Sequence, residues 1–389
     1  MYRIRTFNKI SPVGLNRLDP ALYAVSYSET DEDAILVRSA KLLDMEFNPS
    51  LLAIARAGVG VNNIPLDRCA AAGIPVFSTP GANANAVKEL VVCAMLMSSR
   101  DIPGAIRWVR EQAASGVEVA TVVEKGKSAF VGPELYKKTL GIIGLGAIGS
   151  IVANTAISLG MDVYGYDPFL SVDTALRLDR HVHVVKDIND LYKRADYVTL
   201  HIHYTGKTAH MIDADAIAAM KRGVRVINLA RGEIVDDEAI LAALDTGKVA
   251  VYVTDFPNNR LLTAPHVIAM PHLGASTPES EQNCAAMAVD ELTDYLENGN
   301  IRRSVNLPDM VMDRSGVERL CILHKNVPGM LANITSLFGR DGVNVENLTN
   351  KSKKDYAYTM VDLNSRIKDK VAEELRAIPG MIRVRVLNH

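Results

Sequence analysis

The stretch that most constrains this chain is residues 139–167, TLGIIGLGAIGSIVANTAISLGMDVYGYD. A short apolar run is followed by a glycine-rich turn, a helical stretch and a second apolar run, which predicts a βαβ unit that binds a dinucleotide. Gly144 permits the tight turn, Gly146 lets the backbone approach a pyrophosphate, and Gly149 lets the helix pack closely on the strand. A turn without a ligand would explain the glycines but not the acidic residue that follows.

That acidic residue indicates which dinucleotide binds. Asp167 stands at the end of the second apolar run, about twenty residues beyond the turn, where a carboxylate accepts hydrogen bonds from a ribose diol. Because its charge would repel a 2′-phosphate, we expect NAD rather than NADP as the cofactor. The first helical residues, Ala147 and Ile148, would offer unpaired backbone N–H groups to the phosphates.

Length and charge narrow the class of protein. A chain of 389 residues is long for one core, so we expect two or three domains. The net charge of −2 arises from interspersed signs without a basic block, and nucleic acid is therefore not an expected partner. The start, MYRIRTFNKIS, lacks a signal-type apolar core, and no apolar run is long enough to span a membrane.

The cysteines indicate the redox environment. They lie far apart and form no CxxC pair: Cys69, Cys93, Cys284 and Cys321. This spacing favours neither a disulfide framework nor a zinc site. We therefore expect a protein of the reduced cytoplasm.

Apolar runs alternate with helical stretches over most of the chain. Before residue 83 the runs are YAVSY, AILVRS, LLAIARAG and IPVFST, and after the glycine-rich turn they are MDVYGYD, HVHVV, YVTLHI, VRVINLA, VAVYVTD and VIAMPH. This alternation predicts an α/β protein with two Rossmann-like, doubly wound parallel-sheet lobes. Residues 83–99 have an apolar middle and should form a buried helix, a candidate connection between the lobes.

The C-terminal part has a different pattern. From Val317 it predicts strand, helix, strand, strand, helix and strand, which is the order of a ferredoxin-like βαββαβ domain. We therefore expect a discontinuous substrate-binding domain, an NAD-binding domain, a linker and a C-terminal domain. Their ranges are 1–82 with 275–308, then 83–274, 309–316 and 317–389.

Two residues at predicted strand ends could carry chemistry. Arg231 follows the run VRVINLA, and His272 follows VIAMP. Ligands of open α/β sheets bind beyond the carboxyl ends of the strands. A guanidinium can bind a carboxylate with two parallel hydrogen bonds, and an imidazole can accept a hydroxyl proton near neutral pH. A surface ion pair and a histidine satisfied at a strand end remain the alternatives.

With these motifs in view, the chain resembles the D-2-hydroxyacid dehydrogenase family, and within it the phosphoglycerate-oxidising members that end in an ACT domain. The resemblance covers essentially the whole chain. It rests on RAGVGVNNIPLD, the helix at AVKEL, GIIGLGAIG with Asp167, NLARGEIVDDEAI, TDFP, PHLGAS, SVNLP, HKNVPGM and DGVNV. It implies NAD-dependent oxidation of D-3-phosphoglycerate to 3-phosphohydroxypyruvate, the first step of phosphorylated L-serine biosynthesis. The alternatives are a dehydrogenase of another D-2-hydroxy acid and a non-catalytic NAD-sensing protein.

The resemblance also assigns roles to residues. Arg231 would bind the substrate carboxylate and polarise the 2-oxygen, and His272 would be the catalytic acid and base. The implied cofactor-binding residues are Gly144, Gly146, Ala147, Ile148, Gly149, Asp167, Ala230 and Asp255, with Asp255 at the nicotinamide carboxamide. The implied substrate-binding residues are Arg38, Ser39, Gly58, Val59, Gly60, Asn83 and Arg231, with Arg38 at the phosphate.

One departure from the family pattern concerns the partner of His272. The family usually carries a glutamate shortly after the TDFP segment, where this chain has Asn258 and Asn259. An amide can orient an imidazole but cannot stabilise an imidazolium by charge. The nearest carboxylates in the sequence, Asp255 and Glu233, are the candidates to replace the glutamate.

A second departure lies in HIHYTGKT, where His203 and Tyr204 replace a proline-containing turn of the family. His201 and His203 have a spacing that occurs in metal sites, but two histidines without further ligands are weak evidence. We therefore assign no metal.

The C-terminal part resembles an ACT domain, a module that binds amino acids at subunit interfaces. His324, Asn326 and Asn344 fall on the family positions that bind serine, and they lie in the HKNVPG and GVN segments, which we expect to be loops. L-serine is therefore the expected effector, and a domain that only dimerises is the alternative. The resemblance also implies a homodimer or homotetramer.

Overall fold

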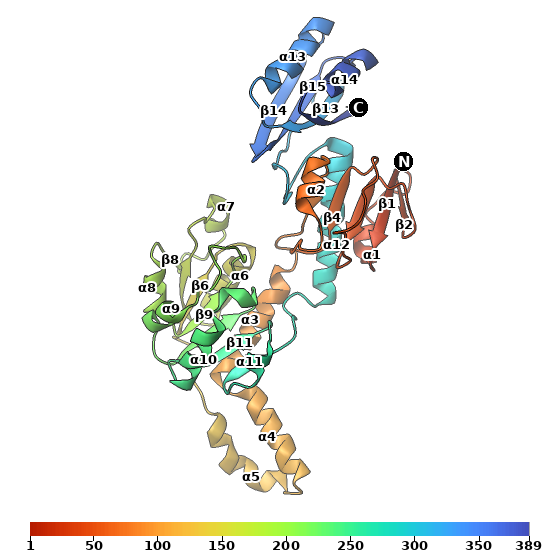
Figure 1. Ribbon diagram of the computed structural model, residues 1–389. Helices are drawn as coiled ribbons and strands as arrows, with labels where there is room; N and C mark the ends of the chain where they lie inside the picture. Colours follow the sequence, from red (N-terminus) through yellow and green to blue (C-terminus); the bar gives the residue numbers. More distant parts are fainter. Residues whose placement is uncertain (389) are drawn as a thin grey trace. The chain divides into compact units, whose positions relative to one another are not determined.

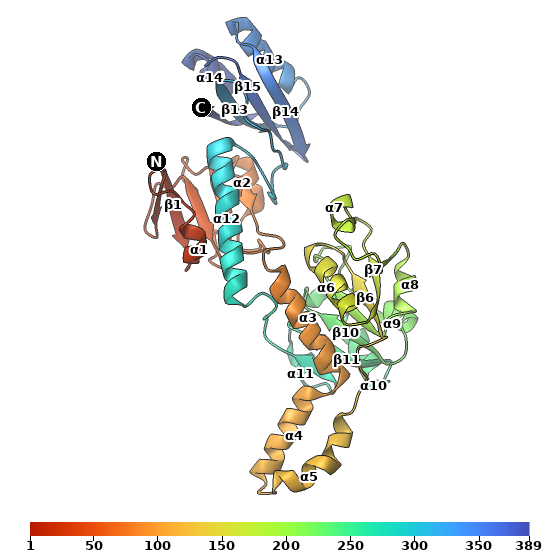
Figure 2. The same cartoon turned by 180° about the vertical axis from the view of Figure 1, so that it is seen from behind.

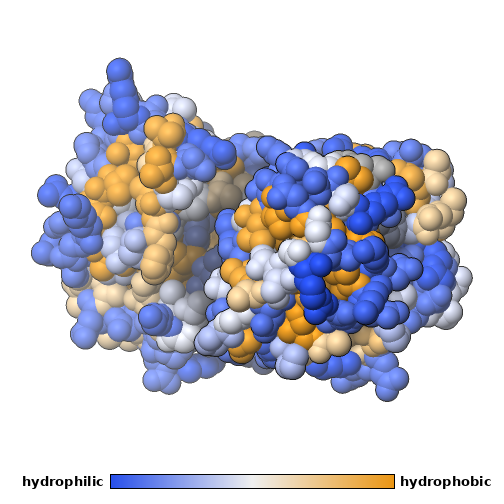
Figure 3. Space-filling model, turned by 90° about the horizontal axis from the view of Figure 1, so that it is seen from above, coloured by the Kyte–Doolittle hydropathy of each residue, from blue (hydrophilic) through white to orange (hydrophobic). Residues whose placement is uncertain are grey.

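The computed structural model describes residues 1–388, and it divides into two compact units (Figures 1 and 2). The first unit contains Met1–Asn83 together with the chain from Pro278 onward, and the second contains Ala84–Thr277. No helix within residues 1–388 is both long and apolar enough to cross a membrane. The face seen from above mixes hydrophilic and hydrophobic residues (Figure 3), as the surfaces of folded proteins generally do.

The first unit is built on a five-stranded parallel sheet with the order β2-β1-β3-β4-β5. Its strands are β1 (Tyr2–Phe7), β2 (Tyr23–Ser26), β3 (Ala34–Val37), β4 (Ala53–Arg56) and β5 (Val76–Phe77). Short helix α1 (Pro12–Leu15) and long helix α12 (Pro278–Asn298) pack on one face, and α2 (Leu66–Ala71) packs on the other. This doubly wound order changes direction between β1 and β3, so ligands are expected at the carboxyl ends of those strands.

The second unit is built on a seven-stranded parallel sheet with the order β12-β11-β10-β9-β6-β7-β8. Its strands are β6 (Thr139–Ile143), β7 (Asp162–Tyr166), β8 (His183–Val185), β9 (Tyr197–Leu200), β10 (Val224–Asn228), β11 (Val249–Thr254) and β12 (Val267–Ala269). Read from β8 this is the order of a dinucleotide-binding sheet, with the switch point between β6 and β9.

Helices cover both faces of this sheet. Val91 of α3 (Ala84–Ser99) and Ala153 of α6 (Ala147–Ser158) belong to the core of one face. The core of the other face contains residues of α8 (Ile188–Tyr192), α9 (Ala214–Ala219) and α10 (Asp237–Asp245). The remaining short helices are α7 (Val172–Ala175), η2 (Gly232–Ile234) and α11 (Asn259–Leu262).

A helical arm extends from the second unit. It consists of α4 (Ile102–Ala114), α5 (Val119–Gly126) and the 3₁₀ turn η1 (Lys127–Phe130), and both views show it standing away from the sheet (Figures 1 and 2). Neither α4 nor α5 contains a buried residue. Trp108 of α4 packs against Phe130 of η1, with ring centroids 5.9 Å apart, and so holds these two elements of the arm together.

The C-terminal part forms a four-stranded antiparallel sheet, here called the third sheet, with the order β14-β15-β13-β16. Its elements are β13 (Glu318–Lys325), α13 (Met330–Asp341), β14 (Val345–Lys353), β15 (Tyr356–Leu363), α14 (Asp369–Arg376) and β16 (Met381–Asn388). Phe338 of α13 and Leu375 of α14 are buried with Ile322 and Val361, so both helices cover one face.

The opposite face of the third sheet packs on the first unit's α12. Leu323 and Tyr358 join the apolar cluster that contains Leu292 and Tyr295 of α12. Several donors on this face also bind backbone carbonyls outside the third sheet, chiefly at the C-terminal end of α12. These donors are Arg385 to Tyr295 and Leu296, Arg319 to Asn298, Tyr358 to Gly299, Lys353 to Ser304 and Val305, and Arg383 to Leu51.

The segment that we expected to be a linker, residues 309–316, is packed as well. Met310 and Met312 are buried, and Met310 forms an isolated antiparallel bridge with Ile301. Arg319 donates to the carbonyls of Met312 and Asp313 at 2.8 Å. The predicted fold class is confirmed: two parallel doubly wound sheets are followed by a small antiparallel βαββαβ sheet.

Candidate active site

The glycine-rich turn lies between β6 and α6, at the switch point of the second unit's sheet. Gly144 has φ 92°, and a Cβ there would stand 2.5 Å from the carbonyl oxygen of His201. A Cβ on Gly149 would stand 1.9 Å from the carbonyl oxygen of Gly144, so both positions require glycine for the fold itself. A Cβ on Gly146 would meet no atom within 4 Å. The fold does not explain Gly146, but the approach of a pyrophosphate does.

Asp167 is held against this turn. Its Oδ2 accepts the backbone N–H of Leu145 at 2.9 Å, and its Oδ1 accepts that of Phe169 at 2.9 Å. Each carboxylate oxygen keeps a lone pair for a ribose hydroxyl. Helix α6 has no side-chain N-cap, so the N–H groups at its first turn remain to bind a phosphate. The residues of this segment therefore fit NAD.

His201, one of the two histidines with metal-like spacing, follows β9 and lies beside the turn. Its ring Nε2 lies 3.1 Å from Thr199 Oγ1, and burial lowers its pKa to about 4. The ring is therefore neutral at physiological pH. Within residues 1–388 no three His, Cys, Asp or Glu side chains converge as a metal site would require.

Arg231 and His272 both contact Phe256, which follows β11. The Arg231 guanidinium lies 5.7 Å from the Phe256 ring centroid, and the His272 ring lies 4.6 Å from it at an interplanar angle of 48°. Arg231 also donates to the carbonyl of Ala230 at 2.6 Å, and Asn228 holds the Arg231 carbonyl at 2.8 Å. The structure thus brings the two predicted catalytic residues together at the carboxyl ends of β10 and β12.

Asp255 is the buried carboxyl of this group. Its Oδ2 accepts the backbone N–H of Gly274 at 3.1 Å, and its Oδ1 has no hydrogen-bond partner within residues 1–388. Burial raises its pKa, and the Gly274 N–H, His272 and Arg231 each oppose that shift. An orphaned, buried acceptor beside an arginine and a histidine fits a site that receives a ligand donor.

Asn258, one of the two asparagines that replace the family's glutamate, has hydrogen-bond partners other than His272. Asn258 caps α11 and donates to Asp237 at 2.7 Å, and Asn259 is the first residue of that helix. The carboxylate of Glu233 is exposed. Asp255 is therefore the carboxyl whose charge acts on His272.

In the first unit, two arginines lie at the carboxyl ends of neighbouring strands. Val37 of β3 is in register with Arg56 of β4, and Arg38 follows directly. Arg56 Nε donates to the Arg38 carbonyl at 2.8 Å, while the N–H groups of Ser39 and Ala40 donate to Asn8 Oδ1 at 2.9 and 2.7 Å. These bonds fix the backbone that carries Arg38. The Arg38 guanidinium pairs with Glu281 of α12 at 2.5 Å.

The remaining predicted substrate residues follow β4 and precede α3. Gly58 accepts the N–H of Thr79 at 3.1 Å, and a Cβ there would meet the Arg56 guanidinium at 3.4 Å. Val59 and Gly60 continue this turn and are partly exposed. Asn83 has a buried Oδ1 without a hydrogen-bond partner within residues 1–388, which suits a ligand donor.

The predicted serine-binding residues do not meet within one chain. Asn326 donates to the Lys354 carbonyl at one end of β14, and the Asn344 N–H donates to Asn364 at the other end. The nine residues of β14 separate them by about 30 Å at the usual rise of a strand.

His324 corrects one expectation. It lies inside β13 rather than in a loop, and it is buried on the face covered by α13 and α14. Its Nδ1 lies 2.8 Å from the Lys325 carbonyl and its Nε2 lies 2.8 Å from Thr359 Oγ1. Burial lowers its pKa. Because both ring nitrogens have partners, His324 is not a free ligand in this conformation.

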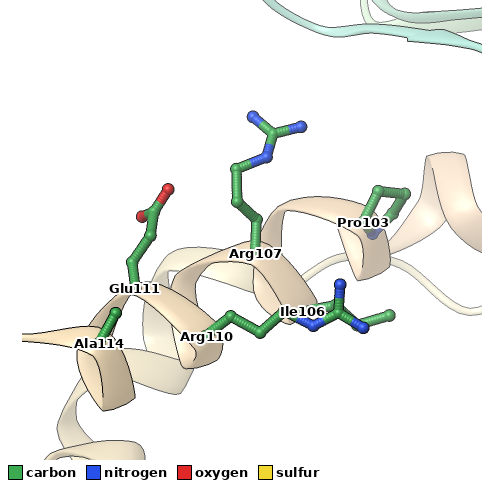
Figure 4. A pocket seen from close by; sticks show the side chains of 6 residues that line it. All are labelled: Pro103, Ile106, Arg107, Arg110, Glu111 and Ala114. Atoms are coloured by element: carbon green, nitrogen blue, oxygen red, sulfur yellow. The ribbon is translucent and has the colours of Figure 1, made fainter.

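Sequence reasoning missed Phe256 and the position of Arg56 beside Arg38. Each had a signal, since Phe256 directly follows Asp255 and Arg56 ends the run LLAIAR. A hollow on α4 is lined by Pro103, Ile106, Arg107, Arg110, Glu111 and Ala114. Arg107 and Glu111 project to the same side of the helix (Figure 4), and the hollow belongs to the arm rather than to the site.

Two family models match the chain. The NAD binding domain of D-isomer specific 2-hydroxyacid dehydrogenases matches residues 92–274, and the AHAS small subunit-like ACT domain matches residues 320–383. The solved NAD⁺-bound 3-phosphoglycerate dehydrogenase of Entamoeba histolytica is 26% identical, with a TM-score of 0.61 over 78% of this chain and 98% of that one. A glyoxylate reductase from Paecilomyes thermophila, 24% identical with a TM-score of 0.64 over 78% of this chain and 98% of that one, shares the fold.

Curated relatives agree with these models. The D-3-phosphoglycerate dehydrogenase of Escherichia coli K12 is 33% identical over 87% of this chain and 82% of its own length. Those of Methanocaldococcus jannaschii and Bacillus subtilis are both 36% identical, over 74% and 80% of this chain. The chain spans 54% and 60% of the length of these two relatives.

The fold and the site define an NAD-binding protein of the 2-hydroxyacid dehydrogenase class. The chain belongs to the D-isomer specific 2-hydroxyacid dehydrogenase family and carries an ACT domain at its C-terminal side. The curated relatives named above are D-3-phosphoglycerate dehydrogenases.

Proposed function

We propose that this protein oxidises D-3-phosphoglycerate to 3-phosphohydroxypyruvate, the first step of phosphorylated L-serine biosynthesis, in the cytoplasm. The observation that carries the proposal is the grouping of Arg231, Asp255 and His272 around Phe256, in the unit that holds the NAD-binding turn. The names of the relatives support the choice of substrate.

Each residue of this group has a separate role in the proposed reaction. Arg231 binds the substrate carboxylate and stabilises negative charge on the 2-oxygen. His272 accepts the hydroxyl proton while C2 loses a hydride, so the alcohol becomes a ketone. NAD, when bound, supplies the hydride acceptor. Asp255 offers its orphaned Oδ1 either to the carboxamide of the cofactor or to the N–H of His272.

The test is NADH formation, measured by absorbance with 3-phosphoglycerate, D-lactate or D-2-hydroxyglutarate as substrate. We expect turnover with 3-phosphoglycerate and a fall in kcat of about 10²–10⁴ in His272→Asn, the usual contribution of an acid–base group. His181→Asn, an exposed histidine paired with Asp179, is the control and should retain kcat. Absence of NADH with every acid would reject the proposal.

One observation favours a second candidate, a dehydrogenase of an unphosphorylated D-2-hydroxy acid. Arg38, the expected phosphate ligand, is already paired with Glu281. Turnover of D-lactate or D-2-hydroxyglutarate without turnover of 3-phosphoglycerate would establish this second candidate.

We further propose that the ACT domain binds L-serine between two copies of the chain. Asn326 and Asn344 stand at opposite ends of β14, so antiparallel pairing of two β14 edges would bring Asn326 of one copy near Asn344 of the other. Calorimetric titration tests this: L-serine should release heat with the parent chain and not with Asn344→Ala, and D-serine serves as the stereochemical control. A parent chain that gives no heat with L-serine would reject it.

We also propose a homodimer or homotetramer, in which the arm formed by α4, α5 and η1 covers a second copy. The arm has no buried residue of its own and exposes Ile102, Ile106 and Val109. Exposed apolar side chains grouped on one element commonly mark an interface.

A further inference from the structure

We propose that Glu281 sets how strongly the protein prefers phosphorylated substrates, by competing with the substrate phosphate for Arg38. The proposal rests on the function proposed above, in which Arg38 receives the phosphate. It makes Glu281 a specificity-determining residue, although it contacts none of the groups that we assign to hydride or proton transfer.

The geometry around Arg38 separates a fixed part from a movable part. The backbone is fixed, because Asn8 accepts the N–H groups of Ser39 and Ala40, and Arg56 donates to the Arg38 carbonyl. The guanidinium is 43% exposed and is held by Glu281 alone among the ion pairs of the described chain. Whatever binds Arg38 must therefore share or displace that carboxylate.

Glu281 comes from a rigid support. It lies in the first turn of α12, whose following turns are buried against β3, β4 and β5. Its Oε1 lies 2.5 Å from Arg38 Nη2, and its side chain is 45% exposed, so solvent can compete for both partners. An ion pair with this exposure is weak, and an anion of higher charge can displace the carboxylate.

The charges of Arg38, Glu281 and the substrate determine whether Glu281 strengthens or weakens the preference for phosphorylated substrates. With Glu281 ionised, the pair is neutral, and a phosphate dianion that reaches Arg38 meets a carboxylate beside it. An uncharged substrate tail meets no such repulsion. Glu281 thus reduces the advantage of phosphorylated over unphosphorylated hydroxy acids without removing it.

The experiment compares Glu281→Gln with Glu279→Gln. Glu279 lies in the same first turn and has the same charge, but it makes no ion pair with Arg38, so it controls for the loss of a negative charge near the start of α12. The readout is the ratio of kcat/KM for 3-phosphoglycerate to kcat/KM for D-lactate. We expect the ratio to rise about 2- to 5-fold in Glu281→Gln, a carboxylate effect of ordinary size at an exposed site, and to change by less than about 1.5-fold in Glu279→Gln.

Two outcomes overturn the proposal: an unchanged or lower ratio in Glu281→Gln, or an equal rise in both variants. A second measurement needs no turnover and separates this proposal from the proposed function. Inorganic phosphate should raise the thermal midpoint of Glu281→Gln more than that of the parent and of Glu279→Gln. If no chain forms NADH but this ordering holds, the reaction is wrong and the competition for Arg38 stands; if the ordering fails, the competition is wrong.

Discussion

The glycines of the glycine-rich turn have different structural roles. Gly149 packs against the Gly144 carbonyl, whereas Gly146 faces open space. We predict that Gly149→Ala lowers the free energy of unfolding by about 2 kcal/mol or more, as overpacking against backbone does. Gly146→Ala should keep the stability of the parent but weaken NAD binding at least about tenfold, because the new methyl group occupies the path of the pyrophosphate.

Urea unfolding and calorimetric titration with NAD measure the two effects separately. The variants are controls for each other, since each should change one quantity and spare the other. If both variants bind NAD as tightly as the parent chain does, the assignment of the glycine-rich turn to NAD binding is wrong.

The buried carboxyl of Glu291 makes the stability of the fold depend on pH. It lies buried on α12, with Oε1 2.9 Å from Arg303 and Oε2 without a hydrogen-bond partner within residues 1–388. Burial raises its pKa from 4.5 to about 8, although Arg303 opposes the shift. Between pH 4.5 and about 8 the folded state binds more protons than the unfolded state. The contribution of Glu291 to the free energy of unfolding is therefore most favourable at low pH and is lost as the pH rises toward 8.

We therefore predict that the urea midpoint of Glu291→Gln falls less between pH 5.5 and pH 8.5 than that of the parent. The difference in free energy of unfolding should be on the order of 2 kcal/mol, since each pKa unit corresponds to about 1.4 kcal/mol. The exposed Glu279→Gln should follow the parent. Identical pH dependence in all three chains would show that Glu291 is ionised in the folded protein at neutral pH.

The sequence predicted the positions of the candidate site residues in the fold better than their contacts. Arg231 and His272 could be placed because each directly follows an apolar run, and strand ends meet at one edge of a parallel sheet. Their common contact with Phe256 depends on side-chain directions that spacing does not encode. The pairing of Arg38 with Glu281 joins residues 243 positions apart, and no local pattern announces it.

At the scale of elements, the apolar runs identified β2 to β5 and every strand from β6 onward, but they missed β1 and the helices of the arm. An expected loop was also wrong at His324. HKNVPG contains a proline and a glycine, and these mark a turn only from Asn326 onward. His324 still pairs with Ala357 in the ladder. A polar side chain can end a buried strand when Thr359 and a backbone carbonyl satisfy it, and such partners are tertiary contacts.

The helical arm leads to a prediction about the assembly of the protein. Ile106 of α4 is half exposed, so a charge there costs little within one chain. If α4 covers a second copy, Ile106→Asp should shift the assembly toward smaller species, measured by light scattering after size-exclusion chromatography. Leu176→Asp, a more exposed apolar position outside the arm, is the control and should leave the mass unchanged. A parent mass retained by Ile106→Asp would place the interface elsewhere.

At the scale of the molecule, one buried arginine of the third sheet forms an ion pair within that sheet and also binds the chain that precedes it. Arg319 and Asp362 are fully buried and share two hydrogen bonds of 2.6 and 2.7 Å, and Arg319 also binds the carbonyls of Asn298, Met312 and Asp313. Burial alone would raise the pKa of Asp362, but Arg319 and Ser315 outweigh it and lower the pKa.

We predict that Arg319→Leu lowers the free energy of unfolding by about 3–5 kcal/mol, because it leaves a buried carboxylate without its partner. Arg340→Leu removes an exposed pair with Glu374 and should cost less than about 1 kcal/mol. Urea unfolding followed by circular dichroism compares the two. Equal losses would mean that the buried pair contributes no more than a surface one.

The packed face of the third sheet has a mechanical consequence. Donors on β13, β14, β15 and β16 all bind carbonyls outside the third sheet, so each of its four strands contributes to the attachment of the ACT domain to α12 and the segment that follows it. These contacts couple the ACT domain to the parallel sheet of the first unit. If an amino acid changes the angle at which two ACT domains meet, the contacts would carry that change to the strand ends that bear Arg38 and Arg56.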